Sequence, residues 1–365
     1  MKVLCSRDSL REALSVIATS MPSRTTKPIL EAVLLEASGQ TLTLTATDLE
    51  VAIRYSLPDV QVEAPGSCLV PAREAADFVR DLTDGTISLE TSKNVMRIFG
   101  KDDFCELALA DAGEFTGLPE IEEVHRFTLP ADRIVHLLEW TVFSSAKELG
   151  RFAMNGVRAE IGNDMIRAIA TDGRRLSLVE QPVDGMKASS LSVTIPTKAV
   201  QQFLRLLQGA KEEVTIVISN DKIALHSRQA TIISRLLEGE FPRYQAVIPK
   251  EGKNTAECDT KQLIQKLRLV AHLCAAEQPV VRFKFASNTL TLTASSPQRG
   301  EARAELPVVF KGTTEEISFN PEYVIEGLKA SLRETVRLEF NDRAAPGKFY
   351  LNENHEYIVM PVVNE

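Results

Sequence analysis

The hydrophobic and polar positions of this chain repeat with a fixed period. Residues 165–178, MIRAIATDGRRLSL, are typical of a strand, a turn at Asp172-Gly173 and a second strand. Residues 42–48 (LTLTATD), 166–172 (IRAIATD) and 290–296 (LTLTASS) share one pattern. Asp48 precedes Asp172 by 172 − 48 = 124 residues, and Ser296 follows by 296 − 172 = 124. A period of this length predicts three copies of one domain.

Each third opens with a strand-like run and an amphipathic helix. The predicted helices cover residues 6–20, 130–143 and 259–273. Ser6 and Asp259 are typical helix-capping residues, and Pro130 suits a first helical turn. Apolar or small residues recur at helical spacing. These stripes are Leu10, Ala13, Leu14 and Ile17; Ile134, Leu137, Leu138 and Thr141; and Leu263, Ile264, Leu267 and Val270.

A second helix is predicted at a matching place in each third, over residues 70–79, 195–204 and 319–328, each with a proline near its start. Alternating strands close the thirds at 96–109, 222–237 and 348–361. The sequence therefore predicts an α+β fold of three repeated domains, each with two helices and about eight antiparallel strands. The expected domains are 1–124, 125–249 and 250–365, with an exposed linker at 249–254.

Charge adds a second pattern. The chain holds 42 basic and 50 acidic residues, so its net charge is 42 − 50 = −8, which argues against DNA binding by overall charge. Basic residues nevertheless recur on the predicted helices, which suggests that the helices face a polyanion while strands and loops carry the acidic groups. They are Arg7, Arg11, Arg73, Arg80, Arg133, Lys198, Arg205, Lys261, Lys266, Arg268 and Lys329.

The sequence contains no recognisable catalytic or cofactor-binding motif. The five histidines show no metal-ligand spacing, and neither a phosphate-binding loop nor a nucleophile elbow is present. For Asp48 and Asp172 we favour a role in turns and caps. The five cysteines are scattered, which is typical of reduced thiols in a cytoplasmic protein. We expect no secretion signal, membrane span, metal or cofactor.

Motifs spread over the whole chain resemble the bacterial DNA polymerase III beta subunit family, the sliding clamps. In the first third they are Lys27–Leu30, Thr47–Glu50 and Val70–Arg73. In the middle third they are Asn155-Gly156, Ala170–Leu176 and Leu237–Tyr244. In the last third they are Phe319–Val324 and Tyr357–Val362.

The resemblance implies a head-to-tail homodimeric ring of six domains, with helices lining a hole around duplex DNA and sheets forming the outer wall. The function it implies is non-catalytic: the ring tethers the replicative polymerase for processive synthesis. It implies sequence-independent DNA contact and, as further partners, a clamp loader and repair and translesion polymerases. A cytoplasmic, nucleoid-associated location follows.

The resemblance also implies three sets of site residues. DNA contact falls on Arg24, Arg73, Glu148, Phe152 and Ala153, to which the basic-helix pattern adds Lys198. The dimer contact pairs Phe104 of one copy with His272 and Leu273 of another. A groove for partner peptides falls on Met154, Thr171, Gly173, Arg174, Arg175, Leu176, Pro242, Val247, Asn320, Tyr323, Pro346, Val359, Met360, Pro361 and Val362.

Other roles stay open for several of these residues. Met154, Val247 and Val359 could close a domain core instead, whereas Arg175 and Met360 are less natural core residues. Phe152 could simply pack, and Arg24 could be an ordinary loop charge. Two other classes of function compete with the clamp: a hydrolase or transferase on a repeated β scaffold, and a purely structural repeat protein.

Overall fold

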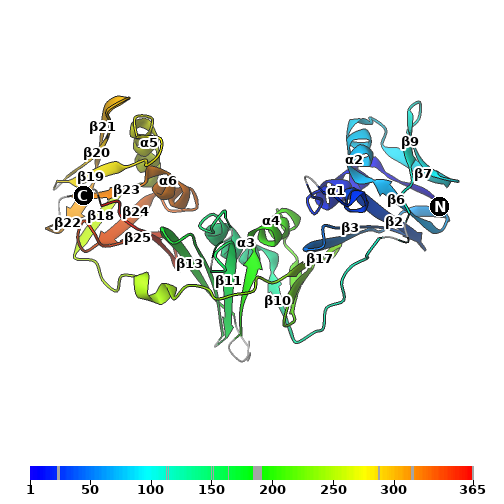
Figure 1. The fold of residues 1–365 in the computed structure, drawn as a ribbon, viewed down its shortest axis with the longest axis horizontal. Coiled ribbons are helices and arrows are strands. Elements are labelled where there is room, and N and C mark those ends of the chain that lie inside the picture. Colours follow the sequence, from blue (N-terminus) through cyan, green and yellow to red (C-terminus); the bar gives the residue numbers. More distant parts are fainter. Residues whose placement is uncertain are drawn as a thin grey trace. The chain divides into compact units, whose positions relative to one another are not determined.

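The computed structural model of the chain describes residues 1–22, 25–111, 113, 115–148, 150, 152–162, 164–183, 191–286, 288–313 and 316–363 (Figure 1). The predicted DNA contact Arg24 lies outside these residues.

Within the described residues, each third of the chain contains two α-helices among antiparallel strands. The first third consists of β1 (Lys2–Ser6), α1 (Arg7–Ala18), β2 (Ala32–Ser38), β3 (Thr41–Thr47), β4 (Val51–Leu57), β5 (Gln61–Ala64), β6 (Gly66–Pro71), α2 (Ala72–Asp81), β7 (Thr86–Ser92), β8 (Val95–Phe99) and β9 (Phe104–Ala108). The second consists of β10 (His125–Pro130), α3 (Ala131–Val142), β11 (Gly156–Gly162), β12 (Met165–Thr171), β13 (Arg175–Pro182), β14 (Leu191–Pro196), α4 (Thr197–Leu206), β15 (Glu213–Ile218), β16 (Lys222–His226) and β17 (Ala230–Arg235). The third consists of β18 (Asn254–Asp259), α5 (Thr260–Ala271), β19 (Val281–Phe285), β20 (Thr289–Ser296), β21 (Gly300–Pro307), β22 (Val309–Lys311), β23 (Glu316–Phe319), α6 (Pro321–Lys329), β24 (Thr335–Phe340), β25 (Gly347–Asn352) and β26 (His355–Val359). The fold class predicted from the sequence is confirmed.

The helix starts follow the predicted capping chemistry, with one exception. The Ser6 hydroxyl accepts a hydrogen bond from the Ser9 N–H at 3.4 Å, and the Asp259 carboxylate accepts one from the Gln262 N–H at 2.7 Å. Pro130 was predicted inside the first turn of its helix but ends β10, where it pairs with Glu213. The predicted apolar stripes are buried, apart from a half-buried Ile264 that packs against the core.

The repeat seen in the sequence is also a repeat in space. β3, β12 and β20 begin at Thr41, Met165 and Thr289, so 165 − 41 and 289 − 165 are both 124. Each pairs with the strand that follows it. At two of the turns an aspartate carboxylate accepts two backbone N–H bonds: Asp48 from Glu50 and Val51, and Asp172 from Arg174 and Arg175. The turn role expected for both aspartates is confirmed.

Contacts divide the chain into two compact units, one formed by residues 1–135 and 198–236 and the other by 136–197 and 237–365. The first unit holds an eight-stranded sheet, β10-β15-β16-β17-β4-β3-β2-β6, in which β17 of the second third pairs with β4 of the first. The second unit holds a nine-stranded sheet, β14-β11-β12-β13-β26-β25-β24-β18-β22, in which β13 pairs with β26 of the last third. Each of these sheets therefore continues from one third of the chain into the next.

Two smaller sheets each have an edge strand that is important for the later argument. One has the order β5-β1-β7-β8-β9 and the other β21-β20-β19-β23, so β9 and β21 are unpaired on their outer sides among the described residues. Of the linker expected at 249–254, only Lys250, Glu251 and Lys253 are exposed. Asn254 is buried in β18, where its side-chain amide donates to the Phe340 and Asn341 carbonyls.

The cores form where helices lie on the sheets. α1 packs beside α2, and α5 beside α6 (Figure 1). The last third buries a large aromatic cluster that includes Phe283, Phe319, Phe349 and Tyr357. Within the described residues no helix is long and apolar enough to span a membrane, and no group of three potential metal ligands occurs.

Gly327 tests how closely α6 packs on this core. A Cβ at Gly327 would lie 2.2 Å from the Tyr357 ring, whereas one at the exposed Gly85 would meet nothing within 4 Å. Alanine favours a helix over glycine by about 1 kcal/mol, but overpacking a core costs about 1–3 kcal/mol. We therefore expect Gly327→Ala to lower the free energy of unfolding in urea titration, and Gly85→Ala to leave it unchanged. Equal stability of the two variants would contradict this packing.

Candidate functional site

A cavity of about 100 Å³ lies in the second unit, beside the turn between β12 and β13. It is bounded by that turn, by the short 3₁₀ helix η3 (Tyr244–Val247) and by the end of β26. Its lining includes these predicted groove residues: Thr171, Gly173, Arg175, Leu176, Pro242, Val247 and Met360. Sequence reasoning missed Arg243, Tyr244 and Ile358.

The floor of the cavity is a cross-strand pair. Leu176 of β13 lies opposite Ile358 of β26, and both belong to a buried cluster with Tyr244. Val359 was expected to contribute to this floor, but it is fully buried in the core of the last third. That expectation is wrong because successive strand residues point to opposite faces of a sheet. Ile358, not its neighbour, faces the cavity.

The walls are more accessible than the floor. Val247 is 41% exposed and Met360 is 37% exposed, whereas Leu176 is 2% exposed. At the rim, the Thr171 hydroxyl donates to the Arg175 carbonyl at 2.6 Å and accepts from the Gly173 N–H at 3.0 Å. Gly173 has φ = 84°, a backbone conformation that favours glycine. The turn therefore presents a fixed edge to an apolar hollow.

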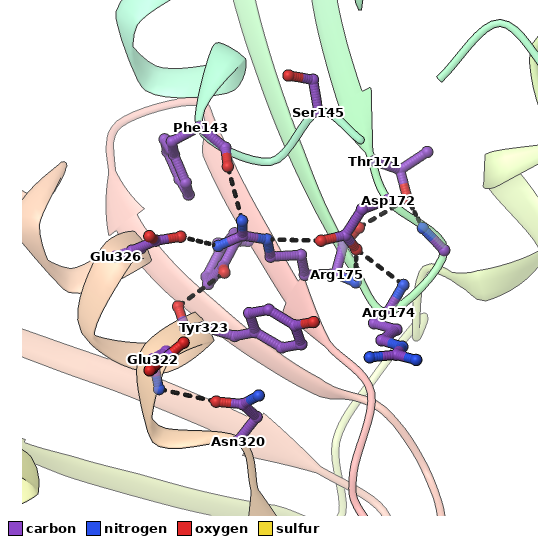
Figure 2. Close-up of polar contacts among 12 residues, drawn as sticks. Phe143, Ser145, Thr171, Asp172, Arg174, Arg175, Asn320, Glu322, Tyr323 and Glu326 are labelled. Carbon is purple, nitrogen blue, oxygen red and sulfur yellow. Dashed lines mark hydrogen bonds and ion pairs between the residues drawn. The ribbon is translucent and has the colours of Figure 1, made fainter. Parts of the chain in front are cut away.

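Arg175 is the most heavily bonded side chain at this site (Figure 2). Its side chain is 4% exposed. The guanidinium donates to the Asp172 carboxylate at 3.0 Å, to the Phe143 carbonyl at 2.8 Å and to the Glu326 carboxylate of α6. It also lies over the Tyr323 ring, 4.6 Å from the centroid. All of these partners belong to the second unit.

These contacts correct one expectation about Arg175. It was expected to be a less natural core residue, yet it is buried, and its guanidinium donates to groups within the protein. Burial opposes the charge of Arg175, but Tyr357 and the Glu326 and Asp172 carboxylates outweigh burial and raise its pKa. The side chain stays charged and fixes the β12–β13 turn to α6.

Arg174 lies in the β12–β13 turn, and Asn320 and Tyr323 lie at the start of α6 (Figure 2). A hydrogen bond with Tyr323 raises the pKa of Arg174. The Asn320 side-chain oxygen accepts from the Glu322 N–H at 2.9 Å and caps α6. Asn320 therefore has its oxygen engaged in the helix and only its amide NH₂ left for other partners.

The remaining predicted groove residues do not line the cavity: Met154, Arg174, Asn320, Tyr323, Pro346, Val359, Pro361 and Val362. Two backbone bonds hold the segment after β26 in place. The Met360 N–H donates to the Arg174 carbonyl at 2.8 Å, and the Val362 N–H donates to the Ser318 carbonyl at 2.8 Å. This segment supports the wall that Met360 forms.

The predicted DNA contacts differ in how accessible they are. Arg73 is exposed in the first turn of α2, and Glu148 and Phe152 are also exposed. Ala153 is 5% exposed, and its N–H donates to the Glu240 carbonyl at 3.1 Å, so it is the least accessible of these residues. Lys198 is ion-paired with Asp48 across the junction of the first two thirds.

The expected segregation of charge onto the helices holds only for part of the chain. Within the described part of the chain, the six α-helices hold 11 basic and 9 acidic residues. A hollow of about 1190 Å³ between α1, α2 and the end of α4 likewise mixes Arg11, Arg73, Arg80 and Arg205 with Asp8, Glu12, Asp77 and Glu212. Only α4 and α5 are basic without acidic residues.

Of the predicted dimer contacts, Phe104 is 62% exposed on β9, His272 is exposed at the C-cap of α5 and Leu273 is half-buried. An exposed aromatic on an open edge strand is what an interface between chains requires.

Comparison with known proteins identifies the family. Models of the N-terminal, central and C-terminal domains of the DNA polymerase III beta subunit match residues 1–119, 128–243 and 245–363. The beta sliding clamps of Chlamydia pneumoniae and Escherichia coli K12 are 31% and 32% identical to the chain, over 99% of its length and 99% and 100% of theirs. The crystal structure of DNA polymerase III subunit beta from Pseudomonas aeruginosa superposes with a TM-score of 0.94 at 28% identity, covering 100% of both chains.

The chain belongs to the DNA polymerase III beta subunit family, the beta sliding clamps. The resemblance inferred from the sequence is confirmed, and with it a processivity factor as the function.

One arrangement in this family member could be mistaken for catalytic machinery. Ser177 and His355 are buried side by side, with Oγ and Nε2 2.8 Å apart, a pair that sequence reasoning missed. The Ser177 hydroxyl donates to the Trp140 carbonyl at 2.5 Å, so His355 Nε2 must donate to Ser177 Oγ. The Asn352 amide then donates to Nδ1 at 3.3 Å. A histidine that donates to the serine cannot take its proton, which argues against a hydrolase.

This network predicts sensitivity to acid. Burial lowers the pKa of His355 from 6.5 to about 3. The unfolded chain binds this proton below pH 6.5 and the folded chain does not, so stability falls as pH falls from 6.5 toward 3. From about pH 7.5 to about pH 5.5 we expect His355 to remove roughly 1 kcal/mol from the free energy of unfolding. His355→Gln is expected to shrink that loss by the same amount in urea titrations, and equal losses would contradict the assignment.

Proposed function

We propose that two copies of the chain close head to tail into a ring that encloses duplex DNA and holds a DNA polymerase on it. The observation that carries this proposal is the strand junction that occurs twice within the chain. In the first junction Ile53 of β4 pairs with Ile232 of β17, and in the second Ser177 of β13 pairs with Tyr357 of β26.

The sheet registers identify which residues would be equivalent at a third junction, the one between two copies of the chain. Ile53, Ser177 and Ala302 lie opposite Ala46, Ala170 and Ala294, which are spaced by 170 − 46 = 294 − 170 = 124 residues. Ile232, Tyr357 and Cys105 lie opposite Leu225, Phe349 and Ile98 in the preceding strands. By the same rule Ala302 of β21 pairs with Cys105 of β9, and Arg303 with Phe104.

These two strands would pair between copies rather than within one. Both are edge strands, and pairing an open edge with a second copy continues the sheet across an interface. The exposed Phe104 supports this pairing because an apolar ring on an edge gains from burial. Two such junctions close a ring of six repeated domains, with helices toward the hole and sheets outside. The repeated domains are 1–124, 125–249 and 250–365.

DNA contact in this proposal is electrostatic and blind to sequence. Lys261, Lys266 and Arg268 on α5, with Arg205 on α4 and Arg73 on α2, supply positive charge on helices. Arg24, Glu148 and Phe152 are added from the set that the family resemblance implies. A ring needs only weak phosphate contacts, because topology rather than affinity retains it and tight contacts would hinder sliding.

The partners bind at the cavity beside the β12–β13 turn. Its buried floor and exposed Val247 and Met360 walls suit a short peptide with a leucine and an aromatic residue, since Met adapts to varied side chains. One site per chain lets the replicative polymerase, clamp loader, and repair and translesion polymerases compete. The free cysteines fit a cytoplasmic location.

Retention on DNA tests the ring. We expect protein loaded by a bacterial clamp loader onto nicked circular duplex to stay through gel filtration and to be lost once the circle is linearised, because a ring slides off open ends. The matched control is the same loaded circle left uncut. Equal retention on linear and circular DNA would favour ordinary binding and refute the enclosing ring.

Val247→Asp tests the cavity. Placing a carboxylate where an apolar side chain contacts a peptide is costly, so we expect about tenfold or greater loss of affinity for a labelled leucine- and aromatic-containing peptide in fluorescence anisotropy. Val309→Asp is the matched control, since Val309 is 61% exposed on β22, away from the cavity. A point change is preferable to truncation at Met360, which would also remove the Val362–Ser318 bond. Identical affinities for the two variants would place peptide binding elsewhere.

A further inference from the structure

The junction between the last two thirds is held by an arginine that reaches into the second helix of the next domain. Arg175 donates to the carbonyl of Phe143, just past the end of α3, and pairs with Glu326 on α6. It therefore connects the β12–β13 turn to the first helix of its own domain and to the second helix of the following one.

Arg299 lies at a similar place in the last third, one residue before Gly300, which the strand register makes the equivalent of Arg175. It ends the turn between β20 and β21, and its guanidinium donates to the carbonyl of Cys274, just past the end of α5, at 3.3 Å. Unlike Arg175 it is exposed, and it forms no ion pair with any residue the structure describes. The next domain in the ring would belong to a second copy.

The residue of α2 that is equivalent to Glu326 can be found by its position in the helix. α2, α4 and α6 begin at Ala72, Thr197 and Pro321, so the sixth residue of each is Asp77, Gln202 or Glu326. Glu326 pairs with Arg175. Gln202 has the matching role at the first junction, where its amide donates to the Thr19 carbonyl, just past the end of α1, at 2.9 Å. Asp77 is exposed, and its partner in the same chain is Arg80, one turn along α2, at 2.7 Å.

We propose that Arg299 of one copy forms an ion pair with Asp77 of the other, once at each of the two junctions of the ring. The pair repeats the Arg175–Glu326 contact with the same polarity, and it joins an unpaired cation to an exposed anion. It rests on the proposed ring, because the two residues meet only if β21 and β9 pair between copies. The ion pair would make dimerisation selective, because each copy presents both the Arg299 cation and the Asp77 anion that the other copy needs.

Charge reversal tests the pair. Arg299→Glu places two acids at both junctions, and Asp77→Arg places two bases there. We expect each variant alone to raise the dimer dissociation constant about tenfold or more, measured by analytical ultracentrifugation over a dilution series. Arg282→Glu is the matched control, because Arg282 is an exposed arginine on β19 of the same sheet, paired with Glu316. It is expected to dimerise like the parent.

Mixing the two variants separates the pair from general damage to the interface. In a dimer of Arg299→Glu with Asp77→Arg, both junctions bring opposite charges together. Native mass spectrometry of the mixture, with one variant carrying a mass tag, is expected to show heterodimer well above the statistical half. Heterodimer at the statistical half, or unweakened single variants, would overturn the ion pair while leaving the ring intact. A monomeric parent protein at micromolar concentration would overturn the ring and this inference with it.

Discussion

Backbone pairing across domain junctions is the constraint on which the rest of the structure depends. β4 with β17, and β13 with β26, join strands from different thirds, so the last strand of one repeat completes the sheet of the preceding one. An edge strand left open exposes a row of unsatisfied N–H and C=O groups. Three repeats in a line satisfy two such edges and leave β9 and β21 open at the two ends. The repeat itself thus generates a surface that a second copy can satisfy.

Different side chains connect the neighbouring repeats at the two junctions. At the first, Lys198 pairs with Asp48 and the Gln202 amide caps the end of α1. At the second, one buried arginine makes both contacts. Removing one partner of a buried charge typically costs about 3–5 kcal/mol, because the other is left unsatisfied. Asp48 at the first junction and Arg175 at the second both have side chains that are 4% exposed, so removing the partner of either leaves a buried charge unsatisfied. The cavity beside the β12–β13 turn lies at the second junction.

The sequence was informative where local chemistry decides structure, and less so where side chains compete in three dimensions. The period, the caps at Ser6 and Asp259 and the turn at Asp172 followed from spacing and residue type. The burial of Arg175 could not be predicted, because Glu326 lies 326 − 175 = 151 residues away. Val359 and Ile358 were confused because a one-residue error exchanges the two faces of a strand. Tyr244 was part of a recognised motif, but its place in the cavity depends on the fold of η3.

The cavity exists because different segments pack over the paired strands at the two junctions. At the first junction Ala52 lies opposite Ile233, and Leu118 and Ile121, from the segment before β10, pack against the cluster that contains Ile233. At the second, Leu176 replaces the alanine opposite Ile358, and the covering segment supplies Phe241, Tyr244 and Ile248. The larger floor and the aromatic cover leave a hollow beside the turn, which Val247 and Met360 border. Linker residues thus cover this position in one repeat and leave a cavity beside it in the next.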